Sequence, residues 1–590
     1  MQHLFQSAKR HEYVPIDDDI EDAIDSTRQQ NNKQQTFNKN VIRIFFIILT
    51  ILSILLYILY KTLLPPIYQS VLSKTTSFKV VSHPEPPTPF WGSISKPYPT
   101  GAFWTNLVVR NGDNAISVIP YGIKTLDAGI QVSYGPTRRQ VSQLAITDPF
   151  VSDLQISSTQ GYIGRSIESY DNVSVTMCYR TQLNGRYRAY LVKGSPYITV
   201  VYDNATPIIS SGLMKILTVE SRVVKGSVGL QYIVTLGNFQ KWLVYCSEPI
   251  ALAWKEDTLT SPLPIRGIIR VAILPLQNME AAFSTLVNYI QRYPTGAQLT
   301  VTHPSPSQSL VILQYTTVGI GSLLMYALPH HLSLMAVTDE GRLAQTALTP
   351  IYCIKGKLKA VVGDIWRLNY NLPPVGWNYV LSEAISLNHL DEIGKSLIQD
   401  VKNIAVLPSA VDVYSFGKQI SRMARLGVIA DSLGIGDVRQ QALSIVEAAL
   451  LPWLQGQNSD QLLYDRIYGG LITTNGLLDP NSDFGNAYYN DHHFHYGYFI
   501  YAAAMVARFD PPFYDNNKAA LDTFVRDICN PDPTDPDFPW ARHKDWFDGH
   551  SWASGLFPQA NGKGQESSSE VCICMYSVCV VYSMVYDTCI

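Results

Sequence analysis

Residues 488–504 of the 590-residue chain read YYNDHHFHYGYFIYAAA. The portion from Tyr498 to Ala507 predicts a helix, which places Asp491 in the loop ahead of it and His495 near its start. An aspartate among tyrosine and phenylalanine rings is partly desolvated; this raises its pKa and suits a proton donor. The alternative is an aspartate that only caps the helix N-terminus.

A second acidic motif follows in GKGQESSSE, residues 562–570. If this segment is helical, Glu566 and Glu570 share one face with their side chains about 6 Å apart. In a pocket, two such carboxylates raise one pKa and can hold a water molecule. The alternative is a solvated helix face.

The segment 542–555, RHKDWFDGHSWASG, lies between these motifs and is rich in aromatic and histidine residues. The aromatic side chains predicted as faces for sugar rings, with core packing as the alternative, are Tyr488, Tyr489, Trp540, Trp546 and Trp552. The histidines that raise a zinc hypothesis are His492, His493, His495, His543 and His550. No H-E-x-x-H or C-x-x-C motif accompanies them, so we expect no metal. An aspartate donor, a glutamate base and aromatic platforms are typical of glycoside hydrolysis by two carboxylates.

Composition narrows the class of protein. The length predicts more than one hydrophobic core. Charged residues make up 16% of the chain, aromatic residues 11%, and the formal net charge is −3, which excludes the basic surface typical of a nucleic-acid-binding protein. No cofactor motif is found, since the chain lacks a Walker loop and a dinucleotide fingerprint.

The N-terminal region predicts a membrane anchor. Residues 1–43 indicate a disordered cytosolic tail, 44–64 a transmembrane helix and 65–98 a Pro-rich stalk. Basic residues are more frequent before the apolar segment than after it, so we expect a single-pass type II protein whose larger part is extracellular. Two N-glycosylation sequons, at Asn172 and Asn204, lie on that outer side.

Three further regions follow the stalk. Short β-branched and aromatic runs separated by turn residues predict a β-sandwich over 99–310. Residues 311–377 are interpreted as a small α/β connector. From 378 to 570 apolar residues recur at helical spacing, which predicts an all-helical domain.

The chain resembles the fungal endo-β-1,3-glucanases of glycoside hydrolase family 81 over roughly residues 85–570. The motifs that carry the resemblance are PYPTGAFWTNLVV, KGSPYITVVYDNATP, YSFGKQISRMARLGVIA, YDRIYGGLIT, NDHHFHYGYFIYAAA, KDWFDGHSWASGL and GKGQESSSE. The resemblance implies an N-terminal β-sandwich, an α/β connector and a C-terminal (α/α)6 barrel whose cleft cuts internal β-1,3 bonds with inversion. β-1,3-Glucan is the implied partner.

The resemblance also implies site residues. Asp491 matches the general acid and His495 its supporting neighbour, while Glu566 and Glu570 match two family glutamates, of which one is the base; we lean slightly to Glu570. Asp545 matches another important acidic position. The residues expected to contact substrate are Tyr488, Tyr489, Trp546, His550, Trp552, Tyr464 and Asp465.

The last stretch, VCICMYSVCVVYSMVYDTCI at 571–590, departs from the family pattern. It has no charge before Asp587, and we interpret it as an aberrant tail that results from a frame error or a retained intron. We therefore expect an incomplete barrel. The alternative function is a catalytically impaired protein that still binds β-1,3-glucan.

Overall fold

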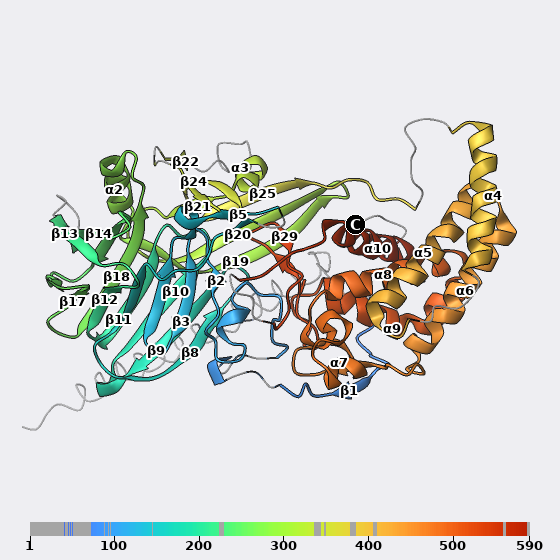
Figure 1. Cartoon of the computed structure of the whole chain (residues 1–590), viewed down its shortest axis with the longest axis horizontal. Coiled ribbons are helices and arrows are strands. Elements are labelled where there is room, and N and C mark those ends of the chain that lie inside the picture. Colours follow the sequence, from blue (N-terminus) through green and yellow to red (C-terminus); the bar gives the residue numbers. More distant parts are fainter. Residues whose placement is uncertain are drawn as a thin grey trace, which may run out of the picture. The chain divides into compact units, whose positions relative to one another are not determined.

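The structure is a computed structural model of the chain (Figure 1). It describes residues 72–85, 87, 89–91, 94, 96–143, 146–222, 229–335, 344–346, 348, 350–377, 385–404, 410–557 and 562–586, together with Val41, Phe45, Ile48 and Thr50. Residues 1–69 and 70–590 form two units. Nearly all of the predicted tail 1–43 and transmembrane segment 44–64 lies outside the described residues. Among the helices of the described part, none has both the length and the apolar character required to cross a bilayer.

Two large antiparallel sheets make up most of the N-terminal region (Figure 1). The eight-stranded sheet runs, in spatial order, through β13 (Ile216–Arg222), β14 (Leu230–Leu236), β15 (Lys241–Cys246), β18 (Ile265–Leu274), β11 (Ile198–Ala205), β10 (Arg186–Val192), β9 (Ser174–Thr181) and β8 (Tyr162–Tyr170). The seven-stranded sheet runs through β16 (Ala253–Lys255), β17 (Thr258–Thr260), β12 (Pro207–Ser211), β7 (Leu154–Ser158), β4 (Gly129–Ser133), β3 (Gly122–Leu126) and β2 (Ile116–Ser117).

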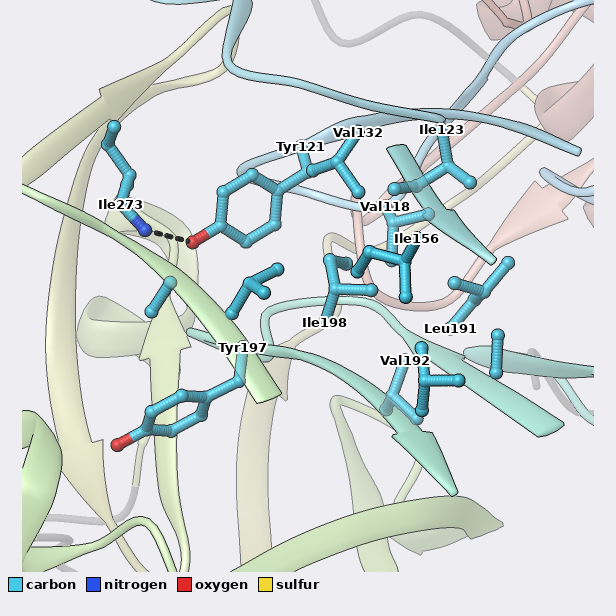
Figure 2. Packing of buried hydrophobic residues seen from close by; sticks show 14 of the residues in the cluster. Val118, Tyr121, Ile123, Val132, Ile156, Leu191, Val192, Tyr197, Ile198 and Ile273 are labelled. Carbon is cyan, nitrogen blue, oxygen red and sulfur yellow. Dashed lines mark hydrogen bonds between the residues drawn. The ribbon is translucent and has the colours of Figure 1, made fainter. Parts of the chain in front are cut away.

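The two sheets share one hydrophobic core. In β3, buried and half-buried side chains alternate, as expected for a strand with one face on a core. Ile123 of β3, Ile156 of β7 and Ile198 of β11 meet in this core (Figure 2). The hydroxyl of Tyr121 accepts a hydrogen bond of 3.0 Å from the backbone N–H of Ile273, so the one polar group of this buried ring is satisfied (Figure 2).

Residues 279–371 add two smaller sheets and two helices. The helices are α2 (Met279–Asn288) and α3 (Pro329–Leu334). One sheet joins β19 (Arg292–Ser305), β20 (Gln308–Gly319) and β25 (Ile365–Asn371); the other joins β21 (Leu324–Ala327), β24 (Gly356–Val362), β22 (Ala344–Gln345) and β23 (Ile351–Cys353). The short paired strands elsewhere are β1 (Lys79–Val81) with β26 (Leu462–Asp465) and β27 (Gly470–Thr473), β5 (Gln140–Val141) with β6 (Ile146–Thr147), and β28 (Lys544–Asp545) with β29 (His550–Ser551).

The C-terminal region is helical, with a hydrophobic cluster of its own. Its helices are α4 (Leu387–Asn403), α5 (Val413–Ser432), α6 (Gly436–Leu454), α7 (Thr474–Leu478), α8 (His492–Phe509), α9 (Pro511–Cys529) and α10 (Ser568–Tyr586), with a 3-10 segment η5 (Ser482–Tyr488) before α8. Three of these helices begin with a side-chain cap, since Ser386 accepts from the N–H of His389, Asp412 from that of Ser415 and Thr473 from that of Gly476. The predictions of a β-rich N-terminal region and a helical C-terminal region are confirmed.

Helix α8 lies at the centre of the helical region. Almost every residue from His492 to Ala507 is buried, because α5, α6, α9 and α10 all contact it. Residues 568–586 form α10, which lies alongside α8 (Figure 1). Gly497 makes that approach possible, because a Cβ atom at this position would stand 2.9 Å from the Cα of Cys574.

One loop of the helical region is anchored in the β-rich core. Phe547 is fully buried and belongs to the same hydrophobic cluster as the two large sheets. Its ring packs edge-on against His331, with centroids 4.7 Å apart. A side chain at Gly194, just after β10, would collide with the Phe547 ring, so this glycine leaves room for the loop to dock.

Candidate active site

Asp491 occupies the residue position directly before α8. Its backbone is left-handed, with φ of 59°, and its N–H donates to the carbonyl of Ala553 at 2.9 Å. Its side chain makes no capping hydrogen bond to the helix, in contrast to the capping alternative. The Asp491 carboxyl group therefore does not cap α8.

The charge environment of Asp491 links it to both predicted glutamates. Burial, and to a smaller extent the negative charges of Glu566 and Glu570, together raise the pKa of Asp491 to about 7. Asp491 is thus close enough to interact electrostatically with two glutamates that lie more than seventy residues later in the chain. Near neutral pH a large fraction of Asp491 is protonated, so it can donate a proton.

Glu570 is held by two tyrosines. Its Oε1 atom accepts hydrogen bonds from the hydroxyl of Tyr414 at 2.9 Å and from that of Tyr498 at 2.8 Å. Tyr414 lies in α5, Tyr498 in α8 and Glu570 in α10, so three helices meet at this carboxylate. Lys418, one turn after Tyr414, donates to the Tyr414 hydroxyl at 3.1 Å.

Glu566 differs from its predicted setting. Helix α10 begins at Ser568, so Glu566 lies ahead of the helix and does not share a helical face with Glu570. The preceding segment is held extended, because Gly564 donates its N–H to the Ser554 hydroxyl at 2.7 Å and accepts from the N–H of Ala553 at 2.9 Å. The Glu566 side chain is exposed.

His495 supports the site through the backbone. Its N–H donates to the carbonyl of Asp491 at 3.0 Å, while its ring is buried and its Nδ1 lies 3.4 Å from Nδ2 of Asn486. Burial lowers the pKa of His495 well below its ordinary value, so the ring is neutral. A neutral buried ring positions the first turn of α8 and does not exchange protons near neutral pH.

The other histidines of the motif serve as packing and hydrogen-bonding groups. His492 bonds through Nδ1 to Asp527 and through Nε2 to the carbonyl of Asn486, both at 2.6 Å. The ring of His493 packs at a tilt against that of His543, with centroids 4.4 Å apart. Within the described residues, no group of three His, Cys, Asp or Glu side chains is arranged to hold a metal ion.

Asp545 forms a buried ion-pair cluster that joins the helical and β-rich regions. The ammonium of Lys193, just after β10, donates to Asp545 and, at 2.9 Å, to Asp548. Burial alone would raise the pKa of Asp545, but the charge and hydrogen bond of Lys193 bring it below its ordinary value. Trp552 also donates its indole N–H to Asp545 at 2.9 Å. Asp545 therefore fixes the loop of residues 545–552 to the β-rich region.

Several residues predicted as substrate contacts are buried. Tyr489 is fully buried and donates its hydroxyl to the equally buried Asp465 at 2.8 Å. Tyr464 is buried and donates to the carbonyl of Asp537, and Tyr488 stacks on Phe557 with centroids 4.8 Å apart. Interior hydrogen bonds or ring stacking thus hold all four residues, Tyr489, Asp465, Tyr464 and Tyr488. Their role as substrate contacts stays a prediction.

The remaining predicted contacts are partly accessible. Trp546 is half-buried and stacks on Trp540, with centroids 4.9 Å apart. His550 donates through Nδ1 to its neighbour's carbonyl at 2.8 Å, and its Nε2 lies within hydrogen-bonding distance of the Lys355 ammonium. Trp552 is also half-buried. Both sequon asparagines, Asn172 and Asn204, have exposed side chains.

The sequence-based prediction missed Tyr414, Lys193 and Lys355. Tyr414 is the first residue of the motif YSFGKQISRMARLGVIA, which supported the family resemblance. The motif alone did not indicate that the Tyr414 hydroxyl contacts a carboxylate. The two lysines lie hundreds of residues from the loop that they contact, and only the fold brings them together.

Comparison with known proteins assigns the family. The glycosyl hydrolase family 81 N-terminal domain matches residues 83–380, and the C-terminal domain of the same family matches residues 384–590. The chain belongs to glycosyl hydrolase family 81. The C-terminal match of the family 81 domain includes α10 and the residues that set the tail apart in the sequence.

Individual family 81 relatives agree with this assignment. A protein named glucan endo-1,3-beta-D-glucosidase from Glycine max is 33% identical over 505 residues, covering 84% of this chain and 73% of the relative. The primary septum glucan endo-1,3-beta-D-glucosidase of Schizosaccharomyces pombe is 30% identical, covering 85% of this chain and 51% of the relative. This chain thus spans about half the length of the S. pombe relative.

A solved structure supports the fold. A mutant of the glycoside hydrolase family 81 from Clostridium thermocellum superposes with a TM-score of 0.70 at 22% sequence identity, and the match covers 85% of this chain and 69% of that one. At this identity the match supports the fold of the chain.

Proposed function

We propose that this chain hydrolyses internal bonds of β-1,3-glucan by an inverting mechanism in which two carboxyl groups act on opposite sides of the bond. Asp491 donates a proton to the leaving oxygen, and a glutamate removes a proton from the attacking water. The observation that carries the proposal is the raised pKa of Asp491, about 7, beside two carboxylates. The relatives named glucan endo-1,3-beta-D-glucosidase indicate the substrate.

We propose Glu566 as the base, whereas the family resemblance slightly favours Glu570. The Oε1 atom of Glu570 already accepts two hydroxyl donors, so this oxygen is engaged by the protein rather than by water. Glu566 is exposed and free to face water. Glu570 then orients the site through its tyrosines.

The proposal is tested with laminarin. Asp491→Asn is expected to lower the release of reducing ends by about 10²- to 10⁴-fold, the usual contribution of a general acid. Asp479→Asn, an exposed aspartate after α7, is the matched control and should keep full activity. The first product seen by NMR should be the α-anomer, because the mechanism inverts the β-linkage. A β-anomer, or an active Asp491→Asn variant, would refute the mechanism.

The choice of base has its own experiment. Azide needs no proton removed, so it should restore activity to Glu566→Ala by replacing the water that the base activates. Glu570→Ala should gain nothing from azide. The reverse pattern would make Glu570 the base. A wild-type chain that migrates slowly in laminarin gels yet releases no sugar would instead favour the binding-only alternative.

Helices α4 to α10 are proposed to belong to an (α/α)6-type barrel, as in the family that the chain resembles. Residues 44–64 are proposed to anchor the chain in a membrane with the hydrolase region outside, on the basis of their sequence. Extracellular exposure predicts N-glycans at Asn172 and Asn204. A mass shift on glycosidase treatment that is lost in Asn172→Gln and Asn204→Gln would support this location, and its absence would argue against it.

A further inference from the structure

A groove of about 540 Å³ lies where the β-rich region meets the loop that follows α9. The β-rich region contributes residues 170–172, at the end of β8, and Leu299 of β19. The loop contributes most of residues 533–545, and further lining comes from the segment 96–103. None of the three carboxyl groups of the candidate active site lines this groove. Its volume is within the range of about 300–1,000 Å³ typical of ligand sites.

A glycosylation sequon opens directly onto the groove. Asn172 lines the groove, has an exposed side chain and is the acceptor residue of the sequon Asn172-Val173-Ser174. The preceding residue, Asp171, holds this turn in place. Its Oδ1 accepts from the N–H of Val173 at 2.8 Å, and its Oδ2 accepts from the Ser174 hydroxyl and from the N–H of Ala297 in β19, both at 2.7 Å. The point from which a sugar on Asn172 would start is therefore fixed at the groove.

The lining of the groove offers apolar surface to a sugar ring. Trp540 is half-buried, and its ring is held by stacking on Trp546 with centroids 4.9 Å apart. The C–H faces of sugar rings pack on surfaces of this kind. The proline and aromatic residues of the lining are Pro97, Pro99, Phe103, Tyr170, Pro533, Pro536, Phe538, Pro539 and Trp540.

Most charged groups of the lining are already paired within the protein. The ammonium of Lys544 donates to the carbonyl of Gly549 at 3.0 Å, and Lys96 is exposed to solvent. The groove therefore favours a neutral occupant over an ionic one. The ion pairs that involve lining residues are Asp535 with Arg526, Arg542 with Asp527, and Asp545 with Lys193.

We propose that an N-linked glycan on Asn172 lies in this groove, where its first sugar rings pack on Trp540 and the surrounding prolines. The inference rests on the extracellular location proposed above, since sequons are used in secreted proteins. In the reaction, Nδ2 of Asn172 forms a bond to the anomeric carbon of N-acetylglucosamine. The pyrophosphate of a lipid-linked oligosaccharide leaves with the electron pair of the broken bond, and the nitrogen loses one proton. The attached glycan then braces the β-rich region against the loop after α9.

The second sequon provides an internal control. Asn204 is exposed at a bulge near the end of β11, has a left-handed backbone with φ of 55°, and does not line the groove. A glycan on Asn204 should extend into solvent. The two asparagines therefore carry the same modification in the same molecule, and only one of them faces the groove.

The test expresses the full chain in a eukaryotic cell, extracts it in detergent and treats the folded protein with an endoglycosidase that cuts between the first two N-acetylglucosamine units. Peptide mass spectrometry follows each site. The Asn172 glycan should be cut about tenfold more slowly than the Asn204 glycan, as expected if it leaves the groove about 10% of the time. After unfolding in urea, both glycans should be cut at the same rate.

Two variants test the groove itself. Trp540→Ala removes the aromatic surface, and Pro536→Arg places a long charged side chain in the groove from an exposed position. Either should raise the rate at Asn172 to that at Asn204, and the Asn204 rate, if unchanged, shows that the variant is folded. Asn172→Gln should also lower the melting temperature by about 2–4 °C, whereas Asn204→Gln should leave it unchanged.

Equal rates at the two sites of the folded wild type would overturn the inference, as would protection of Asn172 that survives in both variants. If, in addition, Pro536→Arg binds laminariheptaose more weakly than the wild type, the groove belongs to the substrate. A chain glycosylated at Asn204 but not at Asn172 would overturn the inference and leave the extracellular location standing. A chain with neither glycan would overturn both.

Discussion

The hydroxyl of Tyr498 donates a 2.8 Å hydrogen bond to Oε1 of Glu570, and so ties the central helix α8 to the first turn of α10. A hydrogen bond to a charged group is worth about 1.5–3 kcal/mol. Tyr498→Phe should therefore lower kcat on laminarin by about 10- to 100-fold with little change in KM. Tyr501→Phe, on the same helix and next to Tyr576, is the control and should leave kcat unchanged. Equal effects of the two variants would exclude a positioning role for Tyr498.

The dependence of kcat/KM on pH should reflect the protonation of Asp491. The acid acts in its protonated form, so kcat/KM should fall as the pH rises through about 7. Removing one of the neighbouring negative charges, in Glu570→Gln, should move this alkaline limb to lower pH, because that charge raises the pKa of Asp491. The measurement is kcat/KM on laminarin across pH in both proteins. An alkaline limb at the same pH in both would mean that another group controls it.

Much of the chemistry was visible in the sequence, because Asp491, Glu566 and Glu570 stand in unusual local contexts. The regular elements were also predictable, since the spacing of apolar residues reports a strand or helix face. The burial of Tyr489 and Asp465 could not be predicted, because a tyrosine–aspartate pair can form either an interior hydrogen bond or a substrate contact. The start of α10 at Ser568 was not predictable either, because Gly564 is held by hydrogen bonds to the Ser554 hydroxyl and the Ala553 N–H.

Lys193 is expected to be a stability determinant. Lys193→Met would leave Asp545 and Asp548 buried without a counter-charge, and breaking a buried pair costs about 3–5 kcal/mol. Thermal or urea unfolding should show this loss. Lys215→Met, an exposed lysine of the same region, should unfold like the wild type. If both variants were equally stable, the cluster would contribute nothing net to folding.

Gly497 is expected to control the packing of α10 on α8. In Gly497→Ala the new methyl would meet the backbone of Cys574, so α10 must shift and take Glu570 with it. Both the melting temperature and kcat should fall. Gly436→Ala, at the start of α6 with open space around it, should be neutral or slightly stabilising. A Gly497→Ala variant with unchanged kcat would show that α10 can move without disturbing the site.

The burial of Phe547 within the cluster of the two large sheets bears on how this enzyme can be engineered. Expressed without residues 99–371, the helical part would expose the phenyl ring of Phe547 and would leave Asp545 and Asp548 without Lys193. A chimera that exchanges one region between family members must therefore also exchange the residues that surround Phe547, because the two regions contribute to one hydrophobic core.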